Sequence, residues 1–366
     1  MKKSILIGFI STIIVFTGCK HNDTGLDSCF TDDFTIGAAL NLGHIFETDS
    51  LGVEVIKENF NSIVAENCTK PMYLQPKEGE FYWKEADAFV DFGVKNGMEV
   101  IGHCLMWHWQ LPNWFFVDDQ GNDVSAETLK ARMKAHITAV VTRYKGRVNG
   151  WDVVNEAILD DGSMRDSKFY KILGKEFIHY AFQCAHEADP NVELYYNDYN
   201  MFMKPKRDAV IALVNDMKSK GIRVDGIGMQ SHLSMTESTI EDVEKGIVEL
   251  AATGAKVMIT EFDMTALPSP WEMSAEVSNT KDYKNELNPY VDGLPEDVLA
   301  QWNKTVRAYL DLFKKHSDVI SRVTMWGVSD RDSWKNNFPV KGRTDYALLF
   351  DRNYTPKQVV TDLINE

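Results

Sequence analysis

Short runs rich in β-branched and aromatic residues alternate along this sequence with longer stretches that have a helical hydrophobic period. This alternation is typical of βαβ units, in which parallel strands are joined by crossover helices. The predicted strands are Thr35–Asn41, Ser62–Lys70, Glu99–Trp107, Val148–Ala157, Val192–Asn200, Gly226–Ser234, Lys256–Met264 and Arg322–Asp330. Eight strands with eight crossover helices in one chain close most naturally into a single (β/α)8 barrel of the α/β class.

Several local signals mark the helices and loops between these strands. One predicted helix carries apolar residues at i, i+3, i+4 and i+7, namely Val210, Leu213, Val214 and Met217. Ser125 can cap a helix that runs to about Gly146, and Pro356 suits the first turn of the last helix. An open doubly wound sheet is the competing fold, but neither G-x-G-x-x-G nor G-x-x-x-x-G-K-[ST] occurs. The long proline-containing loop from Thr265 to Val298, after strand seven, is expected on the active face of the barrel.

The N-terminus has the pattern of a secretory signal over residues 1–18. Two lysines precede an apolar run, Ile5 to Phe16, that is too short to span a bilayer, which needs about 20 apolar residues. Thr17 and Gly18 before Cys19 resemble the lipobox of bacterial lipoproteins, and that resemblance implies that Cys19 is lipidated. A plain signal peptide with an incidental cysteine is the alternative.

On the lipoprotein interpretation, residues 19–33 are a polar tether and residues 34–366 form the catalytic barrel. The protein is then expected to be exported and anchored by lipid to a bacterial membrane, in the periplasm or on the cell surface. The remaining cysteines show no disulfide pattern, so we expect four packed thiols: Cys29, Cys68, Cys104 and Cys184.

The charge balance restricts the partners of this domain. Lys and Arg number 39 against 54 Asp and Glu, a net charge of -15, which repels polyanions and argues against nucleic acid binding. A neutral polysaccharide meets no such repulsion, and the nine tryptophans suit stacking on sugar rings.

Two predicted strands end in a glutamate, at the barrel end where such enzymes place their chemistry. Strand four ends Val153-Val154-Asn155-Glu156, and strand seven ends Ile259-Thr260-Glu261. Strict alternation puts Glu156 on one face with Asp152 and Val154, and Glu261 on one face with Ile259. Two opposed carboxyl groups, one protonated and one ionised, are the machinery of glycoside hydrolysis. Solvated strand ends are the plainer alternative.

Other polar and aromatic residues gather at the same strand ends. They include His103, Leu105 and Trp107 on one face of strand three, followed by His108; Gln230 and His232 on one face of strand six; and Asn197 to Asn200 at the end of strand five. A metal site built from His103, His108, His232 and a glutamate is a weaker alternative, because the spacing fits no H-E-x-x-H or Cys/His zinc pattern. We expect no metal and no cofactor.

The ordered motifs of the chain resemble glycoside hydrolase family 10, whose commonest members are endo-β-1,4-xylanases. The resemblance covers Ile36 to Leu363 and is carried by Glu66-Asn67-x-x-Lys70, Gly102-His103-x-Leu105-x-Trp107-His108, Trp151-Asp152-Val153-Val154-Asn155-Glu156, Gly228-x-Gln230-x-His232, Ile259-Thr260-Glu261 and Trp326-Gly327. Three residues depart from the family pattern: Thr69, Gln75 and Phe262. Thr69 and Phe262 adjoin site residues, so they could alter the sugar pocket.

The resemblance implies retaining hydrolysis of β-1,4-xylan and xylo-oligosaccharides, with Glu156 as acid/base and Glu261 as nucleophile. It further implies that Asn155 contacts the sugar next to the cleaved bond, that His232 orients Glu261, and that the glycone side is lined by Glu66, Asn67, Lys70, His103, Trp107, Gln230, Trp326 and Trp334. Tyr199, at the end of strand five, is also a predicted sugar-binding residue. We expect the charge of Glu261 to raise the pKa of Glu156. Two alternatives remain: a preference for β-1,4-glucans, and a surface glycan-binding lipoprotein that does not cleave.

Overall fold

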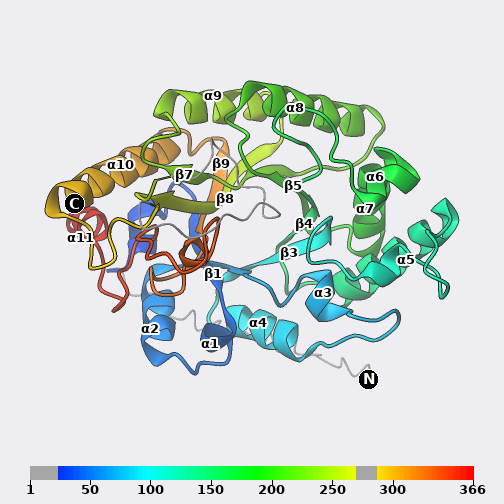
Figure 1. Cartoon of the computed structure of the whole chain (residues 1–366), viewed down its shortest axis with the longest axis horizontal. Coiled ribbons are helices and arrows are strands. Elements are labelled where there is room, and N and C mark those ends of the chain that lie inside the picture. The colour runs from blue at the N-terminus through cyan, green and yellow to red at the C-terminus, as the bar shows by residue number, and fades with distance from the viewer. Residues whose placement is uncertain (1–23, 269–286) are drawn as a thin grey trace, which may run out of the picture.

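Eight parallel strands close into a barrel in the computed structural model, which describes residues 24–268 and 287–366 (Figure 1). The barrel strands are β1 (Thr35–Leu40), β2 (Ser62–Ala65), β3 (Glu99–Trp107), β4 (Gly150–Asn155), β5 (Glu193–Asp198), β6 (Gly226–Met229), β8 (Lys256–Thr265) and β9 (Ile320–Met325). Neighbours pair in chain order, β6 pairs with β8, and β9 pairs back with β1, so the sheet has no open edge. The short β7 (His232–Ser234) pairs with the far end of β8. The predicted (β/α)8 barrel is confirmed.

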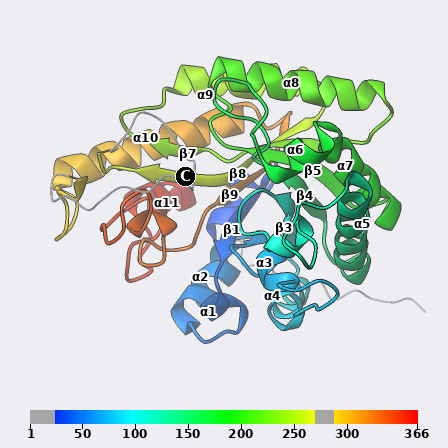
Figure 2. The same ribbon diagram turned by 45° about the vertical axis from the view of Figure 1, so that its right-hand side comes forward.

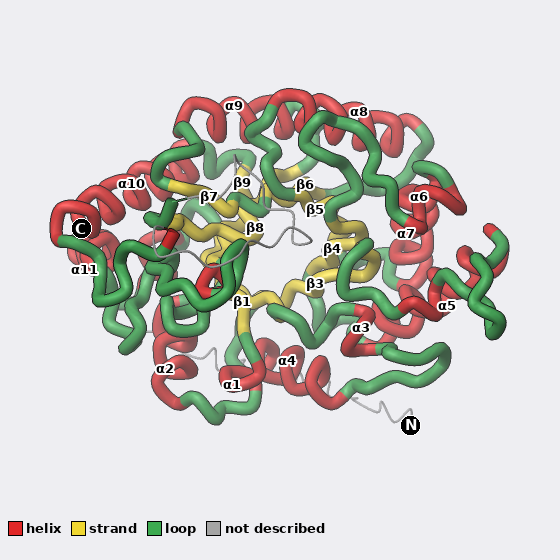
Figure 3. Tube along the Cα trace, viewed as in Figure 1, coloured by secondary structure: helices red, strands yellow, loops and turns green. Residues whose placement is uncertain are grey.

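Helices surround the strands (Figures 2 and 3). Their buried apolar residues form one cluster with those of the strands. The helices are α1 (Leu42–Ile45), α2 (Ser50–Asn59), α3 (Pro71–Leu74), α4 (Lys84–Lys95), α5 (Ala126–Arg143), α6 (Lys168–Leu173), α7 (Glu176–Ala188), α8 (Lys204–Ser219), α9 (Ile240–Ala251), α10 (Glu296–Lys315) and α11 (Gln358–Asn365). The described residues also form the 3-10 turns η1 (Leu26–Phe30), which precedes β1, η2 (Asn113–Phe115) and η4 (Trp334–Asn336). The predicted apolar stripe of α8 is buried, and Ser125 caps α5 through a hydrogen bond from the Thr128 backbone N–H.

Two hydrophobic layers fill the fold. The large one lies between the sheet and the helices, and a small one inside the barrel consists of Ala39, Val64, Ile101, Tyr195, Met258 and Trp326. The four cysteines of the described chain are unpaired thiols, as predicted, and all except the half-buried Cys29 are buried.

Several barrel strands are shorter than the sequence pattern indicates, although β3 has its predicted bounds and β8 extends to Thr265. β2 ends at Ala65, so Glu66 to Lys70 form a loop, and the sixth predicted strand breaks at Gln230 and Ser231, where Ser231 has φ of 61°. The left-handed backbone at Ser231 interrupts the extended conformation that a strand requires. α11 begins at Gln358, so the prediction that Pro356 lies in its first turn is wrong.

The predicted tether is also wrong in its second half, because residues 26–30 fold onto the barrel. Leu26 and Phe30 are fully buried, the Leu26 N–H donates to the Asn59 side chain at 3.2 Å, and Phe30 stacks on Phe34 with ring centroids 4.9 Å apart. Burying apolar side chains as large as Leu and Phe stabilises the folded domain, because their surface is removed from water.

Two other predictions fall partly or wholly on residues 1–23 and 269–286. The signal segment and Cys19 lie outside the described residues, as does the central part of the Thr265–Val298 loop. Within the described ranges, no helix has the length and apolar content needed to cross a membrane.

Replacing Phe30 by alanine tests whether this segment belongs to the domain. Because the ring is buried, Phe30→Ala should lower the free energy of unfolding by about 3 kcal/mol. The exposed neighbour supplies the control, since Asp32→Ala should change it by less than about 0.5 kcal/mol. Chemical denaturation of both variants measures the difference, and equal stabilities would mean that residues 26–30 behave as a tether.

Candidate active site

The carboxyl ends of the strands surround a cavity of about 230 Å³. Its walls are formed by Glu66, Asn67, Lys70, His103, Trp107, Trp109, Gln110, Asn155, Glu156, Gln230, His232, Glu261, Trp326 and Trp334. All the predicted catalytic and sugar-binding residues are therefore brought together except Tyr199. That ring is buried, and its hydroxyl accepts a hydrogen bond from Arg165 at 2.9 Å.

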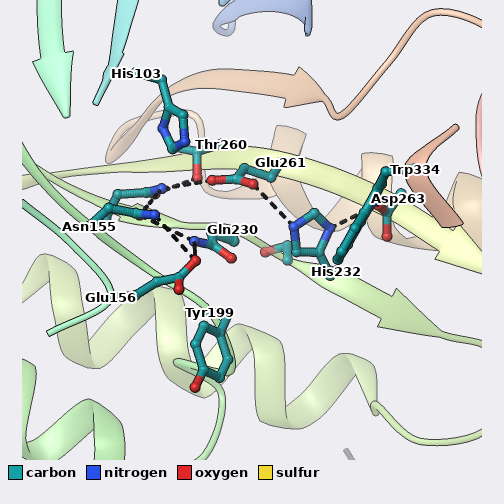
Figure 4. Close-up of polar contacts among 12 residues, drawn as sticks. His103, Asn155, Glu156, Tyr199, Gln230, His232, Thr260, Glu261, Asp263 and Trp334 are labelled. Atoms are coloured by element: carbon teal, nitrogen blue, oxygen red, sulfur yellow. Dashed lines mark hydrogen bonds and ion pairs between the residues drawn. The ribbon is translucent and has the colours of Figure 1, made fainter. Parts of the chain in front are cut away.

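Glu156 lies just after β4, with its carboxyl group buried in the cavity wall (Figure 4). It accepts hydrogen bonds from Trp107 Nε1 at 2.8 Å, Gln230 Nε2 at 2.9 Å and Asn155 Nδ2 at 3.2 Å. Its backbone has φ of 58°, and Arg165 Nε donates to its carbonyl oxygen at 2.8 Å, which fixes this left-handed conformation. Burial is the main cause that raises the pKa of Glu156, so the structure favours the protonated acid.

The charge of Asp198 also raises the pKa of Glu156. The sequence predicts an upward shift caused by the charge of Glu261. The direction is as expected, but burial is the largest cause, and the carboxylate among the main causes is Asp198 and not Glu261.

Glu261 lies across the cavity on β8 and has the opposite electrostatic environment. Asn197 Nδ2 donates to its Oε1 at 2.8 Å, and His232 Nε2 lies 3.1 Å from its Oε2. Burial works to raise the pKa of Glu261, but the His232 hydrogen bond and the charges of His103 and His232 outweigh it and lower the pKa. The carboxylate is therefore held ionised.

His232 is clamped between two carboxylates (Figure 4). Its Nδ1 lies 2.8 Å from Asp263 Oδ2, and Trp334 Nε1 donates to the same oxygen at 2.8 Å. Burial opposes the charged imidazolium, but Asp263 and Glu261 overcome it and raise the pKa of His232 to about 9. A protonated ring donates from both nitrogens, so it bonds Glu261 and Asp263 together.

Neutral amides connect the two glutamates. Asn197 Nδ2 also donates to Asn155 Oδ1 at 2.9 Å, and Thr260 Oγ1 donates to Asn197 Oδ1 at 2.6 Å, which orients the Asn197 amide toward Glu261. A Cβ atom at position 228 would lie 2.3 Å from Asn197 Oδ1, so this position requires glycine. The amides fix both carboxyl groups without adding charge between them.

A second network holds the loop after β2. Lys70 Nζ donates to Gln110 Oε1 at 2.8 Å and to Asn67 Oδ1 at 3.2 Å, and it lies 4.9 Å from the centre of the Trp107 ring. Burial lowers the pKa of Lys70 and raises that of Glu66. These donors and acceptors face the cavity next to the Trp107 indole, an arrangement suited to sugar hydroxyls.

The three departures from the family pattern do not line the cavity. Thr69 Oγ1 donates to the His103 carbonyl oxygen at 2.5 Å, and Gln75 Oε1 lies 2.8 Å from His136 Nδ1. Phe262 packs against Phe313 of α10 with ring centroids 5.5 Å apart. The expectation that Thr69 and Phe262 alter the sugar pocket is therefore not supported by their positions.

Strict alternation misplaced three other residues. Leu105, Val154 and Ile259 belong to the large cluster shared with the helices, and not to the faces that carry His103, Glu156 and Glu261. The ladders of β3, β4 and β8 each shift register near these positions, which breaks the period of two.

Sequence reasoning missed four residues of the site: Trp109, Gln110, Thr260 and Asp263. Asp263 lies two residues after Glu261 on the same strand, so the alternation of side chains could have predicted that both face the cavity. Trp109 and Gln110 lie in the loop after β3, where no period applies. His44, Asp49 and Asp332 are the one group in the described chain with metal-ligand spacing; none lines the cavity, and Arg331 forms salt bridges with both aspartates.

Comparisons with known proteins agree with this geometry. The model of glycosyl hydrolase family 10 matches residues 25–366. An endo-1,4-beta-xylanase A from Xylanibacter ruminicola is 48% identical over 90% of this chain and 90% of its own. The solved structure of an endoxylanase from a sugarcane soil metagenome is 42% identical, with a TM-score of 0.90 over 93% of this chain and 99% of its own. An intracellular xylanase from Thermoanaerobacterium saccharolyticum, solved with xylotriose, is 34% identical, with a TM-score of 0.81 over 94% and 99%.

Removing the charge of His232 should raise the pKa of Glu261, because the ionised carboxylate then loses its cationic partner. Carbon-13 NMR of labelled glutamate side chains measures this in His232→Gln, with Glu261→Gln to assign the signal. His316→Gln removes a histidine that pairs with Glu244 away from the cavity, and should leave the pKa of Glu261 unchanged. An unchanged value in His232→Gln would contradict the electrostatic role of His232.

Proposed function

Because the chain belongs to glycosyl hydrolase family 10, we propose that it is an endo-1,4-β-xylanase that hydrolyses internal β-1,4-xylosidic bonds of xylan with retention of anomeric configuration. The observation that carries the assignment of roles is the pair of buried carboxyl groups on β4 and β8. Their pKa values shift in opposite directions, upward for Glu156 and downward for Glu261. Retaining hydrolysis needs this difference, because one group must donate a proton while the other attacks.

In the first step, Glu156 protonates the glycosidic oxygen and Glu261 attacks the anomeric carbon. The bond to the leaving sugar breaks, and an ester forms between Glu261 and the glycone. His232, bonded to Glu261 and Asp263, keeps the attacking carboxylate ionised and oriented.

In the second step, Glu156 takes a proton from water as that water attacks the anomeric carbon and releases Glu261. The ester carries no negative charge, so its formation favours the ionised form of Glu156. Glu156 thereby acts as acid first and as base second.

The remaining cavity residues are proposed to bind the substrate. Asn155 contacts the sugar next to the cleaved bond, and the other polar and indole groups line the glycone side: Glu66, Asn67, Lys70, His103, Trp107, Gln230, Trp326 and Trp334. Tyr199 is left out of this set because its side chain lies outside the cavity.

The two glutamates should respond differently when replaced. Glu156→Ala should lose roughly 10²–10⁴-fold on xylan, the usual range for general acid catalysis, but much less in the first step with an acidic phenol as leaving group. Glu261→Ala should be inactive on both substrates, because no other group is placed to form the ester. Initial rates and burst amplitudes measure this, and an equal first-step loss on both substrates in Glu156→Ala would contradict the assignment.

We also propose that the protein is exported and held by a lipid on Cys19, in the periplasm or on the cell surface. The basis is the lysines, short apolar run and Thr17-Gly18-Cys19 pattern at the N-terminus. Leu26 and Phe30 are buried in the domain, so we propose that the tether ends before Leu26.

Labelling with a radioactive fatty acid tests this proposal in a bacterial host that processes lipoproteins. The full chain should incorporate the label and sediment with membranes, and Cys19→Ser should do neither. Cys29→Ser, which removes the half-buried thiol in η1, should behave as the full chain. Release of unlabelled full chain into the medium would favour a plain signal peptide.

A further inference from the structure

A fully buried ion pair lies close to Glu156 without lining the catalytic cavity. Lys206 in the first turn of α8 and Asp198 at the end of β5 have no exposed surface, and Lys206 Nζ lies 2.8 Å from Asp198 Oδ1. The same nitrogen lies 3.2 Å from Asp160 Oδ1 and 3.2 Å from the centre of the Tyr199 ring. The Tyr199 side chain, which the sequence placed in the sugar pocket, therefore covers this lysine.

Stability alone is a poor explanation for this ion pair. Moving two charges out of water can cost more free energy than their attraction returns, and apolar residues of similar volume often fill such a space equally well. Hydrogen bonds offset part of the cost, because the Tyr196 hydroxyl donates to Asp198 Oδ2 at 2.6 Å and the Tyr199 N–H donates to Oδ1 at 3.0 Å. The position of the pair points to a role in the reaction.

Asp198 holds the backbone that follows Glu156. The Ile158 N–H donates to Asp198 Oδ2 at 3.3 Å. The Ala157 N–H donates to the Tyr196 hydroxyl at 3.1 Å, and that hydroxyl donates to the same Asp198 oxygen. Burial and the charge of Asp198 raise the pKa of Tyr196, so its hydroxyl keeps the proton that it donates. The two residues after the acid/base are thereby fixed to the end of β5.

Asp198 also contributes charge next to the Glu156 carboxyl group. After burial, its negative charge is the main cause that raises the pKa of Glu156. The other charged groups that face Glu156 are His108 after β3, Arg165 after β4, Lys70 after β2 and Glu261 on β8. Lys206 contacts Asp198 directly, so its positive charge offsets part of the negative charge that Glu156 meets.

We propose that Asp198 and Lys206 are positioning residues for the acid/base: Asp198 fixes the backbone that follows Glu156, and Lys206 limits the negative charge that Asp198 places near its carboxyl group. The proposal rests on the proposed function, which needs Glu156 protonated in the first step and ionised in the second. Asp198 favours the protonated form, and Lys206 favours the ionised form. The pair thereby allows both steps at one pH.

Removing the two charges one at a time should move the pKa of Glu156 in opposite directions. Asp198→Asn should lower it and Lys206→Met should raise it, each by about 0.5–1 pH unit. The double variant should lie between Asp198→Asn and the wild type, because it also loses the opposing charge of Lys206. Carbon-13 NMR of labelled glutamate side chains measures the pKa, with Glu156→Gln to assign the signal, and the alkaline limb of kcat/KM should move with it.

A second buried ion pair supplies the control. Lys357→Met leaves Asp330, 2.9 Å away in the wild type, without its lysine, and should lower stability without moving the pKa of Glu156. If a single variant of the Asp198–Lys206 pair fails to fold, the double variant still tests the proposal, because it leaves neither charge of the pair without its partner. Shifts in the same direction in both single variants, or an unchanged pKa in the double variant, would overturn the proposal. Failure of the wild type to cleave xylan would instead count against the xylanase assignment.

The link from Asp198 to the backbone is tested without changing a charge. Tyr196→Phe removes the hydroxyl that joins Asp198 to the Ala157 N–H, so Glu156 should donate its proton less well. With aryl β-xylobiosides, kcat/KM should fall roughly 3–10-fold for a weakly acidic phenol and less than about twofold for a strongly acidic one. Tyr309→Phe, which removes a buried hydroxyl 3.4 Å from the Ser238 carbonyl oxygen, should change neither. An equal loss on both glycosides, or no loss on either, would overturn the positioning role of Asp198.

Discussion

The chain of charges Asp263–His232–Glu261 determines the chemistry that the cavity can perform. Burial alone would raise the pKa of any carboxyl group at the barrel mouth, and for Glu156 it does. The pKa of Glu261 is lowered instead, because the imidazolium of His232 lies 3.1 Å from its carboxylate. His232 is itself kept protonated by Asp263, which lies 2.8 Å from its other ring nitrogen. Without Asp263, a buried imidazole would favour its neutral form, and the difference between the two glutamates would shrink.

The barrel supplies the positions that this charge chain needs. Glu261 and Asp263 lie on β8, and His232 is the first residue of β7. Because β7 pairs with β8 and His232 stands opposite Asp263, this pairing sets the distance between the imidazole and the two carboxyl groups. Asn197, packed over Gly228, reaches Glu261 from β5, and Asn155 extends the amide network to β4. The functional groups thus come from several strands, and closure of the sheet brings them to one cavity.

The sequence was sufficient to predict the barrel and both glutamates, because the alternation of strands and helices is a global pattern and each Glu ends a long apolar run. It was less reliable within strands. Leu105, Val154 and Ile259 were assigned to the wrong face, since the register shifts in the ladders cannot be seen in the hydrophobic pattern. Gln110 and Trp109 were missed because they lie in a loop. Tyr199 was included because it stands at the end of a predicted strand, but its side chain does not line the cavity.

Proton NMR of the anomeric signals during early digestion of β-1,4-xylan tests the central claim most directly, using protein without residues 1–19. If Glu261 forms a covalent ester that water then opens with help from Glu156, the β-anomer of the new reducing end must build up first, before mutarotation. An initial build-up of the α-anomer would mean a single displacement by water, and would contradict the roles of both glutamates.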